Sequence, residues 1–311
     1  ANYNAAPQAQ QSFAVAKGDQ TISFTSTTPA SAKVAGATYT VAATATSSLA
    51  VAFTIDASAG AVCSIAGSTV SFIGVGTCVI NANQAGNANY NAAPQVQQSF
   101  AVTKNDQTIS FTSAAPASAK VAGASYTVTA SATSSLTVTF SIDVSAAAVC
   151  TIAGSTVAFT GVGNCVINAN QAGNTNYNAA PQAQQTFAVA KGDQTISFTS
   201  IAPLTAKVGG SSYSVTATAS PSALAVAFTI DASATSVCTI SGSTVSFIAA
   251  GACVVNGNQA GNTNYNAAPQ VQQTFSVAKG DQTISFTSVA PVAAQLGGPT
   301  YTVAATASPS A

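Results

Sequence analysis

Cysteine is the residue type whose spacing in this sequence most clearly indicates chemistry. The six cysteines form three pairs, and the members of each pair are fifteen positions apart (78−63 in the first): Cys63 and Cys78, Cys150 and Cys165, and Cys238 and Cys253. A zinc site needs four sulfur or nitrogen ligands close together, but the chain has no His and no two cysteines two to four positions apart. The simplest framework is one disulfide within each pair, each contributing about 3 kcal/mol in the chain-entropy model. Disulfides predict an oxidising compartment, either the periplasm or the outside of the cell.

The acidic and basic residues argue against an enzyme. The chain has no His, Glu or Arg, so neither a Ser/His/Asp nor a Cys/His arrangement can be built. Each repeated unit, defined below, holds two aspartates in different predicted turns, such as Asp19 and Asp56. Glycoside hydrolysis would need two carboxylates within about 5–10 Å of each other. The GVGT turn lacks the following helix and Lys of a phosphate loop, so we predict neither enzyme activity nor a cofactor.

An aspartate also precedes the first predicted strand of each repeated unit: Asp19, Asp106, Asp193 and Asp281. Calcium takes six to eight oxygen ligands, whereas each of these aspartates has only Lys and Gly or Asn before it, so no metal site is predicted. We interpret them as caps of the loop before the strand. A spontaneous cross-link involving Lys33, Asp56 and Asn81 is an alternative, but the last copy has Gln295 where the earlier copies have lysine.

The repeated unit is marked by the stretch at 83–100, NQAGNANYNAAPQVQQSF. This stretch returns almost unchanged at 170–187 and 258–275, and its tail opens the chain. The marker tyrosines, at positions 3, 90, 177 and 265, are 87, 87 and 88 residues apart (90−3, 177−90 and 265−177). A period of this size is typical of one small domain. The predicted domains are the end of a preceding repeat at 1–16, complete repeats at 17–103, 104–190 and 191–278, and the start of a following repeat at 279–311.

Strands must position these residues, because the sequence shows period-two alternation and no helical pattern. In the first complete unit, Ile22 and Phe24 alternate with polar residues, as in a half-buried strand. Six further segments are predicted as strands: 38–46, 49–55, 62–65, 68–73, 77–84 and 95–102. Seven short strands in so short a unit are typical of an antiparallel Greek-key sandwich. We predict an all-β fold of tandem seven-stranded Ig-like β-sandwiches with one disulfide per domain.

The order of the motifs resembles a known family. QTISF at 20–24, LAVAFTID at 49–56, CSIAGSTVSFIGVGTCV at 63–79 and NANYNAAP at 87–94 are similar to the bacterial Ig-like tandem repeats of invasin-like and giant surface adhesins. The resemblance covers all three complete units. It implies a secreted or outer-surface protein whose tandem domains act as a stalk, often carrying a separate adhesive tip. The cysteine pair is a departure, because many such repeats lack it.

Charge and hydropathy narrow the possible partners. Seven Lys and seven Asp cancel, which leaves no basic surface for nucleic acid. The apolar runs are too short to span a membrane within this sequence. Together with the predicted disulfides, these features favour an extracellular or bacterial cell-surface location. The predicted partners are neighbouring repeats of the same chain, with other copies in a filament or bundle and a cell-surface glycan kept open as alternatives.

Short linkers place the marker loop at the junctions between domains. Only four residues, 103–106, separate the last strand of the first unit from the first strand of the next. In an Ig sandwich the loop before the last strand lies at the same end as the start of the first strand, so it should face the preceding domain. Interdomain contacts are therefore predicted for Tyr90, Tyr177, Tyr265, Asp106, Asp193 and Asp281. The alternative is that each tyrosine caps the core of its own domain.

The functional prediction is structural. The segment is expected to be the stalk or a filament-forming part of a long secreted bacterial surface protein, a rigid spacer of disulfide-locked domains. The alternative, from the binding class, is that the repeats themselves bind glycans or neighbouring filaments as an adhesive or biofilm-matrix module. Exposed strand edges and low charge would permit such lateral association.

Overall fold

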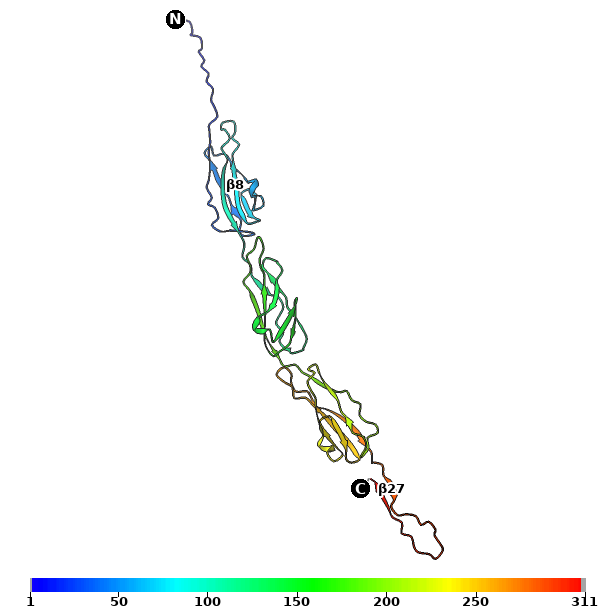
Figure 1. The fold of residues 1–311 in the computed structure, drawn as a ribbon. Coiled ribbons are helices and arrows are strands. Elements are labelled where there is room, and N and C mark those ends of the chain that lie inside the picture. Colours follow the sequence, from blue (N-terminus) through cyan, green and yellow to red (C-terminus); the bar gives the residue numbers. More distant parts are fainter. Residues whose placement is uncertain (1, 309–311) are drawn as a thin grey trace. The chain divides into compact units, whose positions relative to one another are not determined.

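The computed structural model describes residues 2–308, most of whose regular structure is β-strand (Figure 1). The chain divides into two compact units. The first comprises the chain up to Ala114 together with Thr127–Ser141 and Ile167–Gln185, and the second comprises Ala115–Tyr126, Ile142–Val166 and the chain from Thr186 onward. The first complete repeat lies in the first unit and the third lies in the second unit, so each is described by itself.

One sheet of the first repeat has four strands in the order β2-β9-β8-β5. Their bounds are Ala32–Lys33 for β2, Val96–Thr103 for β9, Gly76–Asn83 for β8 and Ala52–Ile55 for β5. The long hairpin of β8, labelled in Figure 1, and β9 is antiparallel. β2 instead runs parallel to the end of β9, pairing Lys33 with Thr103. This parallel pair brings Lys33 beside the start of the linker to the next repeat.

The second sheet of the first repeat is built from β1 (Ile22–Phe24), β4 (Ala43–Ala45), β3 (Tyr39–Thr40), β7 (Thr69–Phe72) and β6 (Cys63–Ala66). β1 pairs with β4, and β3 pairs with β7, which pairs with β6. β3 and β4 are the two halves of the strand predicted at 38–46. Hydrogen bonds from Val41 N to Ser68 O (2.9 Å) and from Thr25 N to Ala42 O (2.8 Å) continue the backbone pairing across the break. This two-sheet strand order is that of an Ig-like sandwich, as predicted.

Two elements of the first repeat differ from the prediction. The connection at 29–36, expected to be only a turn, contains β2, and a short 3₁₀ helix, η1 (Ala57–Ala59), follows β5. β2 has two residues, so it gives no alternation to detect. η1 begins where an oxygen of Asp56 accepts a hydrogen bond from Ser58 N at 3.0 Å. That Asp-x-Ser capping pattern was present in the sequence as a signal for the turn.

The core of the first repeat surrounds its disulfide. Cys63 on β6 and Cys78 on β8 are bonded, so the bridge joins the two sheets, and both residues are at most 1% exposed. The ring of Phe100 packs edge-on against the rings of Tyr39 and Phe72, with centroids 5.6 and 5.8 Å apart. The buried aliphatic residues of this core include Val41, Val70, Ile80 and Val102. Removing these apolar groups from water is the main stabilising contribution to the sandwich.

The third repeat has the same construction. In the sheet equivalent to the second sheet of the first repeat, β19 (Thr195–Phe198) pairs with β21 (Ala217–Ser220). In the same sheet β24 (Thr244–Phe247) pairs with β20 (Tyr213–Ser214) on one side and with β23 (Cys238–Ser241) on the other. Its other sheet has the order β22 (Ala227–Ile230), β25 (Gly251–Asn258), β26 (Val271–Val277). A parallel bridge between Lys207 and Ala278 stands where the first repeat has the two-residue strand β2. The helix η3 (Ala232–Ala234) and a Cys238–Cys253 disulfide complete the match.

The second repeat has equivalent elements, which are shared between the two compact units. They are β10 (Ile109–Phe111), β11 (Ala119–Lys120), β12 (Tyr126–Thr127), β13 (Ala130–Ala132), β14 (Thr139–Ile142), η2 (Val144–Ala146), β15 (Cys150–Ala153), β16 (Thr156–Phe159), β17 (Gly163–Asn170) and β18 (Ala183–Ala190). Cys150 and Cys165 are bonded. All three sequence pairs thus form disulfides, about one per domain. The boundaries of the domains stay a prediction.

The two incomplete ends differ from each other. In the last segment β27 (Thr283–Phe286), labelled in Figure 1, pairs with β28 (Ala305–Ser308), as the predicted first and second strands should. The sequence at 2–16 repeats that of the last strand of a sandwich, yet these residues form no strand. A strand needs a neighbour for its backbone hydrogen bonds, and this sequence contains no spare copy of the strand that would pair with it.

Candidate functional site at the junctions between repeats

The linkers between repeats are bound to the marker loop of the repeat that they enter. Asn105, in the linker after the first repeat, donates its backbone N–H to Asn176 O and accepts from Asn178 N, both at 2.9 Å. These bonds make a parallel bridge between Asn105 and Tyr177. The same bridge joins Gly18 to Tyr90 and Gly192 to Tyr265. Each linker residue therefore belongs structurally to the following sandwich.

The marker loop has a fixed shape because one of its side chains accepts backbone hydrogen bonds within the turn and a glycine adopts the positive φ that the turn requires. The side-chain oxygen of Asn87 accepts hydrogen bonds from Asn89 N (2.8 Å) and Tyr90 N (3.0 Å). Gly86 adopts a φ of +76°, and a side chain there would collide with Tyr90 O. The AGNxNYN sequence thus encodes one loop conformation, and the loop can act as a stable docking point for the linker.

A buried glutamine anchors the loop to the first strand. Gln20 is 3% exposed, and its side-chain N–H group donates to Gln84 Oε1 at 2.8 Å and to Asn91 O at 2.6 Å. The hydroxyl of Ser47 donates to its oxygen. Gln107 and Gln194 are equivalent, at 2% and 3% exposure. Gln20 is not among the site residues predicted from the sequence, although the period-two pattern places it on the same face as Ile22.

The three marker tyrosines lie against the linkers of their own repeats. A methyl group on Gly18 would lie 3.4 Å from Cδ1 of Tyr90, and one on Gly192 would lie 3.1 Å from Cδ1 of Tyr265. The same methyl on Gly192 would also collide with the carbonyl oxygen of Val121, in the preceding repeat. The Tyr265 ring therefore covers the linker where it passes the preceding repeat. Its effect on the angle between repeats stays a prediction.

Each predicted junction aspartate pairs with a lysine of the preceding repeat. Lys33 donates to Asp106 Oδ2, Lys120 to Asp193 Oδ2 at 2.6 Å, and Lys207 to Asp281 Oδ2. The other oxygen of Asp106 accepts from Asn178 Nδ2 at 2.8 Å, so this carboxylate connects the preceding repeat to the marker loop of the following one. Asp193 accepts in the same way from Asn266, also at 2.8 Å. Sequence reasoning had identified the loop and the aspartate but not the lysine, which lies 73 positions away.

Three further hydrogen bonds reinforce the junctions. The ammonium group of Lys104 donates to Asn174 O at 2.7 Å, and that of Lys191 donates to Asn262 O at 2.6 Å. The turn after β16 also reaches the third repeat, because Val162 N donates to Asn264 Oδ1 at 3.3 Å. Backbone pairing, the lysine–aspartate pair and these bonds together hold each linker at several points.

Two of the junction aspartates, Asp106 and Asp193, are stabilised in their charged form. The hydrogen bond from Lys33, then that from Asn178, then the charge of Lys33 lower the pKa of the Asp106 carboxyl from its usual value. Lys120 and Asn266 lower the pKa of Asp193 in the same way. Because these side chains are well exposed, water and salt screen the attraction, and the pairs serve to orient the linker more than to stabilise the fold.

Acid should loosen the junctions. Since the pKa of Asp106 and Asp193 is lowered in the folded chain, their contacts are complete above about pH 4 and are lost as the pH falls through the lowered value. We expect solution scattering to show a wider spread of inter-repeat distances at about pH 2 than at pH 7. The double variant Lys33→Gln, Lys120→Gln, which carries the residue found at position 295, should show the wider spread at both pH values. A pH response in this variant equal to that of the native chain would contradict the assignment.

Removing the tyrosine ring should also loosen a junction. Tyr265→Ala takes away the side chain that covers Gly192, so the angle between the second and third repeats should vary more in solution scattering. Tyr265→Phe keeps the ring and should behave as the native chain does. Unchanged scattering from Tyr265→Ala would favour the alternative in which the tyrosine serves only its own domain.

The described residues give little support to a lysine cross-link or to a metal site. Asp56 and Asn81 are brought together, because Asn81 donates to Asp56 Oδ2 at 3.4 Å beside the bonds from Ser58 and Gln97. Lys33, the third residue of the suggested cross-link, is instead bound to Asp106. The Ser58 hydrogen bonds, side chain first, are the main cause of a lowered pKa at Asp56. Within residues 2–308 no group of three His, Cys, Asp or Glu side chains could hold a metal ion. Across the same residues no helix is long and apolar enough to cross a membrane.

The fold and the junctions define a class: tandem Ig-like β-sandwiches, each closed by a buried disulfide and linked through its marker loop. No protein-family profile and no curated protein matches the chain. Solved structures similar to it include Drosophila N-cadherin EC1-4 (11% identity, TM-score 0.29, covering 85% of this chain and 76% of that one). Sidekick-1 immunoglobulin domains 1-5 (14%, 0.33, 83% and 58%) and domains 1-6 of the surface layer protein SbsC (15%, 0.26, 85% and 41%) are also similar. The chain thus spans about half the length of the last two. With identities and TM-scores this low, the fold assignment rests on the strand order of the chain itself.

Proposed function

We propose that this chain is a structural spacer, the stalk or a filament-forming segment of a long secreted bacterial surface protein of the adhesin type. The observation that carries the proposal is the linker: Asn105 is hydrogen-bonded by its backbone to the next repeat, and Asp106 is paired with Lys33 of the preceding one. A linker held in this way resists bending, so that the number of repeats would set the reach of the protein.

The three disulfides support an extracellular location for this stalk. They are buried between sheets, where they persist in an oxidising compartment. The motif order at 20–24, 49–56 and 63–94 supports the invasin-like adhesin family specifically. The partners that follow from this role are the neighbouring repeats of the same chain.

The length of the particle tests the spacer role. A sandwich of this strand length extends roughly 40 Å, allowing about 3.3 Å per residue plus loops. Deleting residues 104–190 removes one period and joins two equivalent linker positions, so the maximum dimension in solution scattering should fall by roughly 40 Å. A length that does not change with repeat number, or a distribution as broad as that of flexibly linked domains, would contradict a rigid spacer.

A second candidate function is binding of a glycan through a sheet face. Beside β8, Gln95, the residue before β9, donates to Asn83 Oδ1 at 3.0 Å, and the exposed Gln97 of β9 donates to the buried Asn81 Oδ1 at 2.7 Å. These paired amides recur in the other repeats and could hydrogen-bond sugar hydroxyls. Binding of bacterial or host polysaccharides in calorimetry, lost with Gln95→Ala and its equivalents, would support this function over an inert spacer.

A further inference from the structure

Tension along the chain enters and leaves each repeat at two separated points. In the third repeat the entering linker is bridged to the marker loop, which precedes β26, through Gly192 and Tyr265. The chain leaves the repeat at Ala278, directly after β26. Seven residues of strand, each about 3.3 Å long, lie between the two points. A pull on both linkers therefore acts along the direction of β26.

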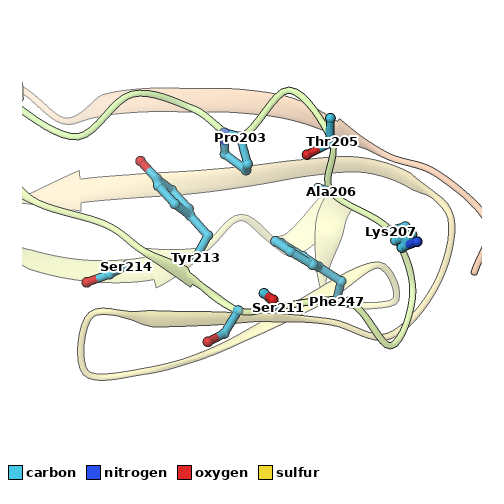
Figure 2. A pocket seen from close by; sticks show the side chains of 10 residues that line it. Pro203, Thr205, Ala206, Lys207, Ser211, Tyr213, Ser214 and Phe247 are labelled. Atoms are coloured by element: carbon cyan, nitrogen blue, oxygen red, sulfur yellow. The ribbon is translucent and has the colours of Figure 1, made fainter.

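A short parallel contact links the two paths of tension. The connection that contains Ala206 and Lys207 runs parallel to the end of β26. Val208 N donates to Ala278 O at 3.1 Å, and Ala278 N donates to Ala206 O at 2.8 Å. On its other side the connection borders a cavity of about 400 Å³, and Figure 2 shows Ala206 and Lys207 at its rim. The other repeats have the same contact, between β2 and β9 and between β11 and β18.

Parallel neighbours that are pulled in opposite directions slide past each other. Their hydrogen bonds lie side by side along the ladder and are loaded together, whereas a hairpin pulled apart at its open end loses one bond at a time. Lys207, on the connection, and Asp281, just beyond β26, add an ion pair to the same contact. β19 precedes the connection, so detaching it from β21 frees only the chain before residue 203. The connection and the end of β26 thus form a clamp that must open before the sandwich can.

The disulfide lies outside this clamp. Cys238 and Cys253 are fifteen positions apart, and tension passes from one to the other through their sulfur atoms. The residues between them, which include β24, are therefore not stretched. A closed loop of this length withholds roughly 50 Å of extension, at about 3.3–3.6 Å per residue.

We propose that each repeat is an extensible element under tension, held closed by the parallel clamp and limited in its extension by the disulfide. Forced unfolding is governed by the rate at which the folded state is lost, whereas a disulfide acts mainly on the unfolded chain. The clamp therefore sets how long a repeat stays folded under tension, and the bridge sets how far it then lengthens. The proposal rests on the spacer role, because a spacer transmits tension.

Force spectroscopy of the 311-residue chain, held by its two ends at constant tension, tests the limit. Each complete repeat should add roughly 200–220 Å of contour length, which is one period less the closed loop and less a folded length of roughly 40 Å. In dithiothreitol a delayed step of roughly 50 Å should follow each of these, as the bridge is reduced to two thiols and the reagent is oxidised to its cyclic disulfide. First steps that are already roughly 50 Å longer, or no delayed step, would overturn the limit.

Ala278→Pro tests the clamp within the same molecule. Ala278 is exposed, and proline removes the N–H that donates to Ala206 O. One of the three steps should then occur roughly tenfold sooner at the same tension, because this hydrogen bond no longer slows unfolding. The first two repeats, which are unchanged, should keep the lifetimes that they have in the native chain.

Two further variants keep the clamp test decisive. Lys207→Gln, which carries the residue found at position 295, removes the ion pair without altering the backbone and should shorten the same lifetime even if Ala278→Pro prevents folding. Ile240→Val is the matched control, since it trims the core inside the closed loop and should lower stability in urea without shortening the lifetime under tension. Native lifetimes in a folded Ala278→Pro chain and in Lys207→Gln, or equal shortening by Ile240→Val, would overturn the clamp. Any of these results leaves the length of the particle in solution scattering, and so the spacer role, unchanged.

Discussion

Replacing both cysteines of each pair with alanine should lower the free energy of unfolding of each repeat by about 3 kcal/mol. Cys63 and Cys78 come from strands in opposite sheets. In the unfolded chain the bridge keeps these two segments close together, which lowers the conformational entropy gained on unfolding. Natural domains have a net stability of only about 5–15 kcal/mol, so this is a large fraction. For a domain of this size it corresponds to a fall in Tm on the order of 12–24 °C.

Thermal and urea unfolding of the native chain and the six-fold variant would measure this change. The effect should be shared by the three repeats, because each has one bridge with the same fifteen-residue separation. Val144→Ala serves as a control, because the Val144 side chain is 90% exposed. Truncating it should change the free energy of unfolding by no more than about 0.5 kcal/mol. A six-fold variant as stable as the native chain would show that the bridges are not what holds the sheets together.

Burial of the disulfides should also slow their reduction. The six cysteines are at most 1% exposed, and thiol–disulfide exchange requires access to a sulfur atom. Dithiothreitol should therefore leave the bridges intact under native conditions and reduce them only when a repeat unfolds. Rapid labelling of cysteines in the folded, reductant-treated chain would contradict this expectation.

The sequence predicts a strand wherever apolar and polar residues alternate over several positions. Ile22 and Phe24 on β1 and the long strand β8 are examples. β2 was missed because its contribution is a two-residue parallel pairing with β9, whose partners are 70 positions apart (102−32). The break between β3 and β4 was missed for a related reason, since local alternation continues through Val41 while the pairing partner changes from β7 to β1.

At the junctions, the sequence predicts interdomain contacts for the loop tyrosines and the aspartates but gives no partner for them. Lys33 reaches Asp106 only because β2 pairs with the end of β9, and β2 itself was unpredicted. Gln20 left a clearer signal, because it occupies an inward position of the strand pattern and recurs in every copy of DQTIS.

Replacing that glutamine should give the second large effect. Gln20→Ala, with the same change at Gln107 and Gln194, removes the side-chain donor to Asn91 O, one of the two donors to Gln84 Oε1 and the acceptor of the Ser47 hydroxyl, with the equivalent losses in the other repeats. Loss of a partner by groups packed around a buried side chain costs about 1–3 kcal/mol, so each repeat should lose roughly that much free energy of unfolding. The marker loop should also become more mobile, because the hydrogen bonds of Gln20 connect it to the first strand.

The loop effect distinguishes this prediction from a general loss of stability. Amide hydrogen exchange should accelerate at Gly18, whose N–H donates to Asn89 O, and at Asn91, whose N–H donates to Gly18 O, more than in β8 and β9. The matched control is Gln95→Ala with its equivalents at 182 and 270, exposed glutamines whose side chains donate to one neighbouring amide each. That control should change stability by no more than about 0.5 kcal/mol and should leave exchange at the linkers unchanged. Equal effects of the two triple variants would mean that burial of Gln20 does not hold the loop. A selective effect would connect one buried side chain to the linker that sets the geometry between repeats.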